Sequence, residues 1–497
     1  MKTQKSTQQT ILWILLAVII LLGALLRFYQ IGEQSFWLDE AASYSAITSG
    51  FPEFVSTGNM AMFYLLAALW TRLVPLVTEA SLRSLTAIFS ILSIPLMFFA
   101  GKAIFEDERK GLLCGLLAAF LLAINSTEVR YAQEFRSYSL TTLLTLASTL
   151  LLMQLVKESA KKTRTLVLYT LSTVAAIYSH MYAGFLVAAQ VVSLLFLIPA
   201  FKADAHFLRR LLLSYFCVIL LLIPLALLIL TTGSSPLGWL GQPKLSDIPK
   251  LFLFLTGTTR PGYLIIHLAF ALLGALGGIG IFSKSISQQR WRFILLLINI
   301  VLPIGLSFIV SLVLQPIFIH RYLLMTGPYL TLLVAAGIVT AAELLHKAFP
   351  KALPLPLVAA VFAVLFGVLA YSGLSNYYEN FSKEDWRSAA NILATHCQQS
   401  LRIYYPDWLA PSVKFYEPSL NPIDSAELSA YLQELKVDGN DTLPQAENYE
   451  RACLVFSHLQ VGERSQNAEL LRQAIQKQFP NALITELNSV TVEIYSR

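Results

Sequence analysis

The chain has 497 residues, of which 56% are hydrophobic and 13% are charged, and its formal net charge is +6. An ordinary soluble protein has roughly 45–50% apolar and about 25% charged residues, so this composition excludes a soluble enzyme and a disordered chain. The 4 cysteines exclude a disulfide scaffold, and the small basic excess does not favour nucleic acid as a partner. A membrane protein with several spans and room for one soluble domain remains.

Continuous apolar runs predict eleven transmembrane helices, because each run is long enough for a spanning helix and none alternates as a barrel strand would. The predicted spans are 11–26, 84–101, 111–126, 138–156, 165–179, 183–200, 211–232, 263–283, 293–314, 322–345 and 354–374. A cleaved signal peptide is the alternative for residues 1–27, but no small-x-small cleavage site follows the apolar run.

Residues 59–77 are a twelfth candidate, and the distribution of basic residues decides against it as a span. With eleven spans, one set of alternating short loops holds seventeen Lys and Arg residues and the other holds nine. The basic-rich side is expected to be cytoplasmic. A twelfth span would turn Lys157–Arg164 outward, so we expect 59–77 to be a helix on the outer membrane surface.

The composition changes after the last span. Helix and strand patterns alternate there, which is typical of a small α/β domain. The expected helices are 383–396, 426–436 and 466–479. The expected strands are 401–405 and 453–457, with one or two more over 482–495. We therefore expect a transmembrane domain over 1–375, with its first outer loop at 28–82, and an extracytoplasmic domain over 376–497. Cys397 and Cys453 could form a disulfide there or remain two buried thiols.

Ionisable and aromatic residues gather at the predicted outer ends of the spans, whereas the span centres are nearly free of charge. Charged groups at membrane depth are costly, so those that persist tend to be functional. The pattern predicts a polar cavity at the outer leaflet. Its expected charged residues are Asp39, Glu40, Glu134, Arg83, Arg136 and Arg321. Its expected ring side chains are Tyr44, Tyr131, His180, Tyr182, His320 and Tyr322.

These residue types favour one kind of chemistry. A carboxylate in a partly dry site can take a proton from a hydroxyl, and arginine forks suit a phosphate. At lipid depth, this combination predicts group transfer from a lipid phosphate to a hydroxyl or amine. The alternatives are structural: a solvated Asp39-Glu40 loop, helix-end anchors at Glu134, Arg136 and Arg321, a snorkelling Arg83, and structural histidines.

In this order along the chain, the motifs resemble those of the GT-C glycosyltransferases over about residues 1–390. The resemblance is to the family-39-like group of protein O-mannosyltransferases and, more distantly, to the aminoarabinose transferase of lipid A. It is carried by 35–41 (SFWLDEA), 82–85 (LRSL), 130–138 (RYAQEFRSY), 179–182 (SHMY), 320–323 (HRYL) and 383–387 (KEDWR).

The resemblance implies an inverting transfer of a sugar from a polyprenyl-phosphate donor outside the cytoplasm. Asp39 then corresponds to the catalytic base, with Glu40 beside it and Glu134 as the acid of the second loop. Arg83, Arg136 and Arg321 would hold the donor phosphate, and Asp39 and Glu134 could share a divalent metal ion. The acceptor would be a lipid, a glycan or a protein, and the bilayer would be that of a bacterial plasma membrane.

One element departs from the family pattern. Many relatives carry His-Pro-Pro in the first loop, where this chain has Asn59-Met60-Ala61. A contact that relatives make through that histidine is therefore in doubt here.

The sequence leaves alternatives open for one loop and for the function. The outer loop 231–263 contains an amphipathic stretch at 247–255, which could cover the site and move when the donor enters, or could be a passive surface loop. A transporter or flippase of a lipid-linked sugar would use similar phosphate-binding residues. A non-catalytic scaffold would bind a partner through its tail and tolerate replacement of Asp39.

Overall fold

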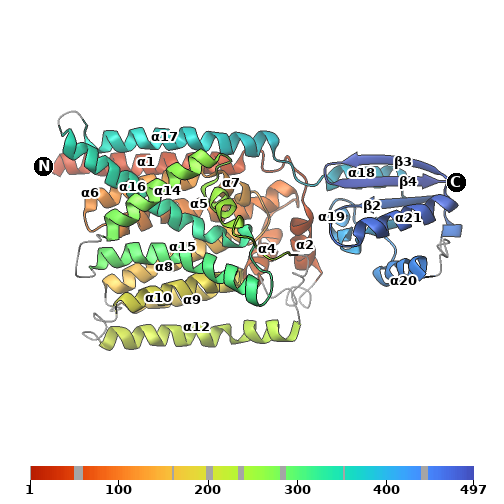
Figure 1. Ribbon diagram of the computed structural model, residues 1–497, viewed down its shortest axis with the longest axis horizontal. Coiled ribbons are helices and arrows are strands. Elements are labelled where there is room, and N and C mark those ends of the chain that lie inside the picture. Colours follow the sequence, from red (N-terminus) through yellow and green to blue (C-terminus); the bar gives the residue numbers. More distant parts are fainter. Residues whose placement is uncertain are drawn as a thin grey trace. The chain divides into compact units, whose positions relative to one another are not determined.

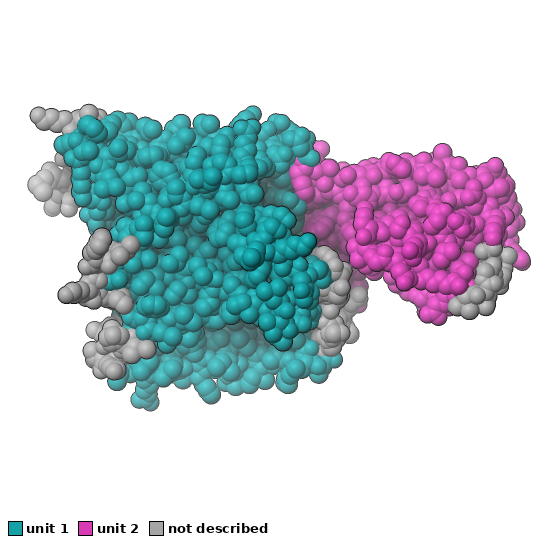
Figure 2. Space-filling model, viewed as in Figure 1, with its two compact units in different colours: residues 1–31, 54–76, 81–380 teal, residues 32–53, 77–80, 381–497 magenta. Residues whose placement is uncertain are grey.

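A computed structural model describes residues 2–49, 60–158, 162–197, 205–232, 240–279, 287–350, 353–437 and 446–497. The chain forms two compact units, coloured separately in Figure 2. Unit 1 comprises Met1–Ile31, Phe54–Leu76 and Ser81–Asn380, and unit 2 comprises Gly32–Glu53, Val77–Ala80 and Phe381–Arg497. Two pieces of the first outer loop, one of which carries Asp39, are thus grouped with the C-terminal residues. The expectation had placed that whole loop with the spans.

Unit 1 is helical (Figure 1). Its α-helices are α1 (Lys2–Phe28), α4 (Ala61–Leu73), α5 (Glu79–Ile104, which begins in unit 2), α6 (Glu108–Ile124), α7 (Ser126–Ala132), α8 (Tyr138–Lys157), α9 (Thr163–Ser179), α10 (Ala183–Leu194), α12 (Ala205–Thr232), α13 (Asp247–Thr256), α14 (Pro261–Ile279), α15 (Gln288–Val313), α16 (Gly327–Ala348) and α17 (Leu355–Ser375). The 3₁₀ helices η1 (Leu195–Leu197) and η2 (His320–Thr326) and the π-helix η3 (Asn376–Asn380) complete it.

A helix lies at each of the eleven expected spans, and the chain is an integral membrane protein. Among the described residues, eight helices are long and apolar enough to cross a bilayer, or nine if α6 and α7 form one bent span. The 17-residue α9 and the apolar segment Ala183–Leu197 are shorter than these helices. Residues 59–77 contain α4, whose 13 residues extend about 20 Å, too short for a hydrocarbon core of about 30 Å.

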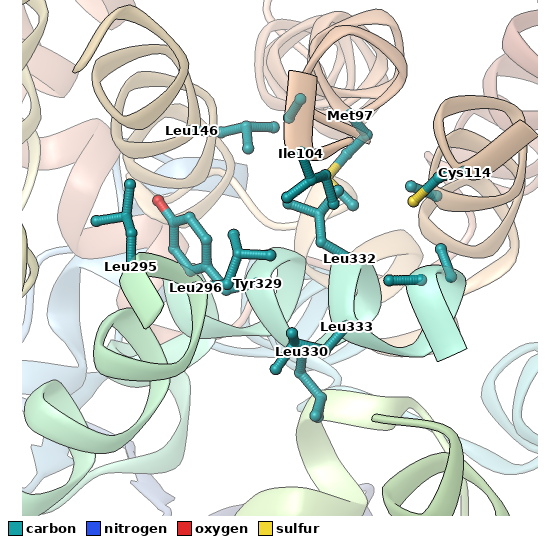
Figure 3. Close-up of a cluster of buried hydrophobic side chains, with 14 of the residues drawn as sticks. Met97, Ile104, Cys114, Leu146, Leu295, Leu296, Tyr329, Leu330, Leu332 and Leu333 are labelled. Atoms are coloured by element: carbon teal, nitrogen blue, oxygen red, sulfur yellow. The ribbon is translucent and has the colours of Figure 1, made fainter. Parts of the chain in front are cut away.

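Helix α16 lies at the centre of the hydrophobic core of unit 1. Its buried side chains point in several directions, toward α5, α6, α8 and α15, as the labelled residues of Figure 3 show. A helix that is apolar on all sides is suited to such a position. Its backbone approaches α14 closely at Gly274 and Gly337: a Cβ on Gly337 would lie 1.8 Å from the carbonyl oxygen of Phe270. Small residues permit such contact between membrane helices.

A sharp corner joins α6 to α7, with an angle of 60° between them. Backbone groups released by a break inside a membrane need new partners. The buried Arg27 side chain supplies them, because it donates hydrogen bonds to the carbonyl oxygens of Leu122 (3.2 Å) and Ala123 (2.9 Å). Arg27 also donates to Ser90 Oγ at 2.7 Å. This arginine therefore stabilises the corner from which α7 begins.

Unit 2 contains a four-stranded sheet in the order β1-β2-β4-β3. Its elements are α2 (Leu38–Thr48), α18 (Trp386–His396), β1 (Leu401–Tyr405), η4 (Asp407–Leu409), α19 (Ala410–Tyr416), α20 (Ser425–Val437), η5 (Ala446–Asn448), β2 (Arg451–Phe456), α21 (Arg464–Gln478), β3 (Asn481–Leu487) and β4 (Val490–Ser496). Strands β1 and β2 are parallel, and the other two pairs are antiparallel. This is the small α/β domain that the alternating pattern predicted.

Side chains alternate across the sheet and form two apolar layers. Helices α20 and α21 cover the face that carries Leu454, while α18 and α19 cover the face that carries Val455. Leu38 of α2 packs against this second layer, so a helix from the first outer loop completes the unit. Cys397 and Cys453 form a disulfide in the same layer, with their Cα atoms 6.3 Å apart.

Candidate active site

Helix α7 is fixed at its start by Asn125, which the sequence analysis did not single out. The Asn125 Oδ1 accepts from the backbone N–H groups of Thr127 (2.9 Å) and Glu128 (3.1 Å), as an N-cap does. Its Nδ2 donates to the carbonyl oxygen of Leu255 at 2.9 Å. The Asn-Ser-Thr-Glu sequence after an apolar run is a recognisable helix-start signal.

The same corner holds the end of α13. Ser126 Oγ donates to the Gly257 carbonyl at 2.7 Å, and Thr127 Oγ1 donates to the Phe254 carbonyl at 2.6 Å. Carbonyl groups in the last turn of a helix lack intrahelical partners, and these side chains supply them. Helix α13 coincides with the amphipathic stretch expected in the loop 231–263, and in this structure it is anchored to α7.

Ring side chains from α7, α8, α13, η2 and the α9–α10 turn meet in one group, which we call the aromatic site. It consists of Tyr131, Tyr138, His180, Tyr182, Phe254, His320 and Tyr322. The His180 ring centroid lies 4.6 Å from that of Tyr322 and 5.3 Å from that of Tyr182. Tyr131 and Tyr138 are 5.1 Å apart.

Five of the six expected ring residues therefore come together, although they are separated by up to 191 positions in the chain. The sequence analysis did not single out Tyr138 or Phe254 as members of this group. The Phe254 ring centroid lies 5.5 Å from that of Tyr131 and 6.0 Å from that of His320. The amphipathic pattern of α13 could have indicated that one of its apolar residues faces this group. The sixth expected ring, Tyr44, belongs to α2 of unit 2, where it meets Phe415 edge-on at 5.1 Å.

Two arginines lie near the aromatic site: the Arg321 guanidinium carbon is 5.6 Å from the centroid of the Tyr322 ring, and Arg136 acts electrostatically on His180. Burial, and after it the positive charges of Arg136 and Arg321, lower the pKa of His180 to about 3. The imidazole is therefore neutral at ordinary pH, and its Nδ1 accepts from the backbone N–H of Tyr182 at 3.3 Å. Guanidinium groups near buried, neutral rings suit a phosphate with an attached apolar chain.

Glu134 lies in a second group with Arg130 and Arg83. Its side chain is buried, and Oε1 lies 3.4 Å from Arg130 Nε. Its Oε2 has no hydrogen-bond partner among the residues that the structure describes. Glu134, Arg83 and Arg130 all interact electrostatically with Tyr377. A buried carboxylate next to cations can accept a hydrogen bond from a hydroxyl, and the expected role of Glu134 as the acid of the second loop stays a prediction.

Arg83 has a structural contact. Only 1% of its surface is exposed, and its Nη1 donates to the carbonyl oxygen of Ile31 at 3.0 Å. Arg83 thus holds the chain shortly after α1. Its expected role as a phosphate ligand stays a prediction.

Asp39 and Glu40 lie in the first turn of α2 in unit 2. Asp39 is partly exposed. Glu40 is fully buried, and its Oε2 forms an ion pair with Lys383 Nζ at 3.0 Å. Its carboxylate also accepts from the backbone N–H of Trp37 at 3.4 Å. Glu40 therefore stabilises the start of α2, a role that the expectation of a catalytic acid did not include.

No group of three potential metal-ligating side chains occurs in the part of the chain that the structure describes. The two residues expected to share a metal, Asp39 and Glu134, belong to different units. A divalent cation stays a prediction. Asn59, at the position of the family histidine, lies outside the described residues.

Comparison with solved structures identifies the fold as that of the GT-C membrane glycosyltransferases. ArnT from Cupriavidus metallidurans in the apo state matches 99% of this chain and 98% of its own, at 12% identity and a TM-score of 0.60. The same protein bound to undecaprenyl phosphate matches with a TM-score of 0.56 at 12% identity, over 97% of both chains. No protein-family model and no curated protein matches the sequence.

An archaeal oligosaccharyltransferase is also similar. AglB from Archaeoglobus fulgidus, in complex with an inhibitory peptide and a dolichol-phosphate, matches with a TM-score of 0.54 at 11% identity. The match covers 99% of this chain and 75% of that chain. At such low identity the likeness concerns the fold, and the roles of individual residues rest on the geometry described above.

Proposed function

We propose that this protein is a glycosyltransferase that moves a sugar from a polyprenyl-phosphate donor to a hydroxyl or amine acceptor on the extracytoplasmic side of a bacterial plasma membrane. The observation that carries the proposal is the aromatic site with Arg136 and Arg321 beside it, within a GT-C fold. Two similar structures contain polyprenyl-type lipids, undecaprenyl phosphate in ArnT and a dolichol-phosphate in AglB, which supports the choice of donor.

The arginines would bind the donor phosphate. Forked guanidinium groups make paired hydrogen bonds to phosphate oxygens, and a site with little water strengthens them. Their charge stabilises the phosphate most when it leaves with the electron pair of the sugar–oxygen bond, so they act on the transition state. The ring faces would pack on the sugar or on the first isoprene unit.

Asp39 is the proposed base. Its carboxylate takes the proton of the acceptor hydroxyl as the acceptor oxygen forms a bond to the anomeric carbon. The bond from that carbon to the phosphate oxygen breaks, and polyprenyl phosphate leaves with the electron pair. Attack from the side opposite the phosphate inverts the anomeric centre. The acceptor would be a lipid, a glycan or a protein.

Purified protein in lipid with a panel of radiolabelled polyprenyl-phosphate sugars tests this proposal. Release of polyprenyl phosphate together with label on a membrane acceptor is the expected result, and it would name the sugar. Movement of intact donor across the bilayer without release would instead identify a transporter and overturn the proposal. Binding of a partner without either activity would identify a scaffold.

A further inference from the structure

The first outer loop enters unit 2 through a dense set of hydrogen bonds to the segment that follows η3. Gln34 Oε1 accepts from the Lys383 backbone N–H at 2.6 Å, and Ser35 Oγ accepts from that of Trp386 at 3.2 Å. The Phe36 backbone N–H donates to Tyr416 Oη at 2.6 Å, and its ring stacks on Phe415 at 4.4 Å. The residues just before α2 therefore have a defined path.

Two consecutive residues, Lys383 and Glu384, then hold the first turn of α2. Glu384 Oε2 accepts from the backbone N–H of Leu38, the first residue of the helix, at 3.0 Å. This N–H has no partner within a helix, and a carboxylate is favourable beside the positive end of the helix dipole. Lys383 Nζ pairs with Glu40, the third residue of the helix, at 3.0 Å. Asp39 lies between these two anchored positions.

Glu384 is itself oriented by two further groups. Trp386 Nε1 donates to Glu384 Oε2 at 2.6 Å, and His458 Nε2 lies 3.1 Å from Glu384 Oε1. Both carboxylate oxygens are thus engaged, which restricts rotation of the side chain. The position of Leu38 depends in this way on α18 and on the residues after β2.

The burial of the Lys383–Glu40 ion pair indicates that the pair fixes local geometry more than it adds stability. The side chains of Lys383 and Glu40 are 4% and 0% exposed. Removing both charges from water costs about as much as their attraction returns, so a buried pair is weak evidence for stability and is best attested as a device that specifies geometry. Here the pair specifies the residue next to Asp39.

We propose that Lys383 and Glu384 are positioning residues, which hold the Asp39 carboxylate in the geometry needed to take a proton from the acceptor. The inference rests on the proposed function, and it assigns two residues of unit 2 a role in positioning the base. A displacement of about 1 Å of a reacting group can lower a rate about 100-fold.

Steady-state kinetics of Lys383→Met, Glu384→Ala and Glu384→Gln test the inference in the full chain. We expect Glu384→Ala to lower kcat about 100-fold, with KM for the donor changed less than about 3-fold, because phosphate binding is separate from proton transfer. Glu384→Gln should recover at least a tenfold part of that loss, because its amide oxygen can still accept from Leu38. If Glu384 only stabilised the fold, kcat would not differ between Glu384→Gln and Glu384→Ala when the two variants have equal thermal midpoints.

Arg472→Met is the matched control. Arg472 pairs with the buried Glu493 at 2.7 Å in the same unit, and its loss should lower the thermal midpoint without a comparable fall in kcat. Hydrogen exchange adds a readout that does not need turnover. Amides of a peptide covering 36–46 should exchange faster in Glu384→Ala than in the wild type and Arg472→Met.

The outcomes separate the two proposals. If Asp39→Asn abolishes transfer while Lys383→Met and Glu384→Ala keep the wild-type kcat, the positioning inference is wrong and the proposed function stands. If Asp39→Asn itself keeps full activity, the base role of Asp39 and the positioning inference both fail, while the transfer activity stands. If Glu384→Ala does not fold, equal kcat values for Glu384→Gln, Lys383→Met and the wild type would still overturn the inference.

Discussion

The Nζ atom of Lys383 lies 3.0 Å from Oε2 of Glu40, although 343 positions separate the two residues in the chain. Both side chains are almost completely buried. The contact ties helix α2, which carries Asp39, to the segment after η3, so unit 2 is assembled from distant parts of the chain.

The first prediction concerns the stability of this ion pair. Glu40→Gln leaves the buried Lys383 ammonium without its counter-charge, which should destabilise the fold by about 3–5 kcal/mol. The double variant Glu40→Gln/Lys383→Met should recover most of this loss, because neither charge remains. Thermal unfolding of the full chain, followed by tryptophan fluorescence, measures the stability of the single and the double variant. Additive losses in the double variant would contradict a coupled pair.

A second prediction concerns donor affinity. Replacing Arg136 or Arg321 by Gln removes a charged donor, and such hydrogen bonds are worth about 1.5–3 kcal/mol, so Kd for undecaprenyl phosphate should rise about 10- to 100-fold. The Kd of Arg321→Lys should lie between those of the wild type and Arg321→Gln, because lysine keeps the charge and loses the planar fork.

The control for this prediction is Arg210→Gln. Arg210 donates to Thr163 at the opposite end of α9 from His180, about 25 Å away along the helix, and its loss should leave Kd unchanged. Unchanged binding in both Arg136→Gln and Arg321→Gln would remove these arginines from the phosphate site.

The third prediction follows from the lowered pKa of His180. Its pKa is about 3 in the folded chain against an ordinary value of 6.5, so the unfolded chain binds more protons between these values. The stability contributed by the neutral imidazole is complete above pH 6.5 and is lost as the pH falls toward 3. At pH 5 the loss should be about 2 kcal/mol.

His180→Phe keeps a ring beside Tyr322 and cannot titrate. Its thermal midpoint should therefore fall less than that of the wild type between pH 7 and pH 5, while the exposed His396→Phe should follow the wild type. Parallel curves for the wild type and His180→Phe would show that this histidine is not held neutral by burial.

The fourth prediction concerns the disulfide. Cys397 and Cys453 are 56 positions apart, and closing a loop of that size stabilises a fold by roughly 2–4 kcal/mol. Dithiothreitol should lower the thermal midpoint of the wild type and leave that of Cys397→Ala/Cys453→Ala unchanged. Because Cys114 and Cys217 are free thiols, Cys217→Ala is the control and should respond as the wild type does. If dithiothreitol also lowers the thermal midpoint of the double variant, the effect of the reductant has a cause other than this disulfide.

The spans and the α/β tail were predictable because their signals are local. Apolar runs predicted a helix at each of eleven positions, and alternation predicted the strand 401–405 with the bounds it has in the structure. Helix α19 was missed because it has seven residues with a proline near its start. Short helices have little periodicity to detect.

The candidate site was predictable in its residue types and less so in its arrangement. Ring residues at the ends of several spans meet, as expected of span ends that share one side of the membrane. The roles of Glu40 and Arg83 were not visible, because their partners, Lys383 and the Ile31 carbonyl, are defined by tertiary packing. From the sequence alone, nothing indicates which of the two neighbouring acids in the first turn of α2, Asp39 or Glu40, will be buried.

The central claim is that Asp39 takes the acceptor proton in a transfer from a polyprenyl-phosphate sugar. The most direct test measures polyprenyl phosphate release by the wild type and by Asp39→Asn in lipid, with donor binding measured in parallel. We predict that the variant binds donor with unchanged affinity and releases polyprenyl phosphate at least about 100-fold more slowly, since general-base catalysis contributes typically 10²–10⁴-fold. Equal release by both proteins, with equal donor binding, would contradict the account.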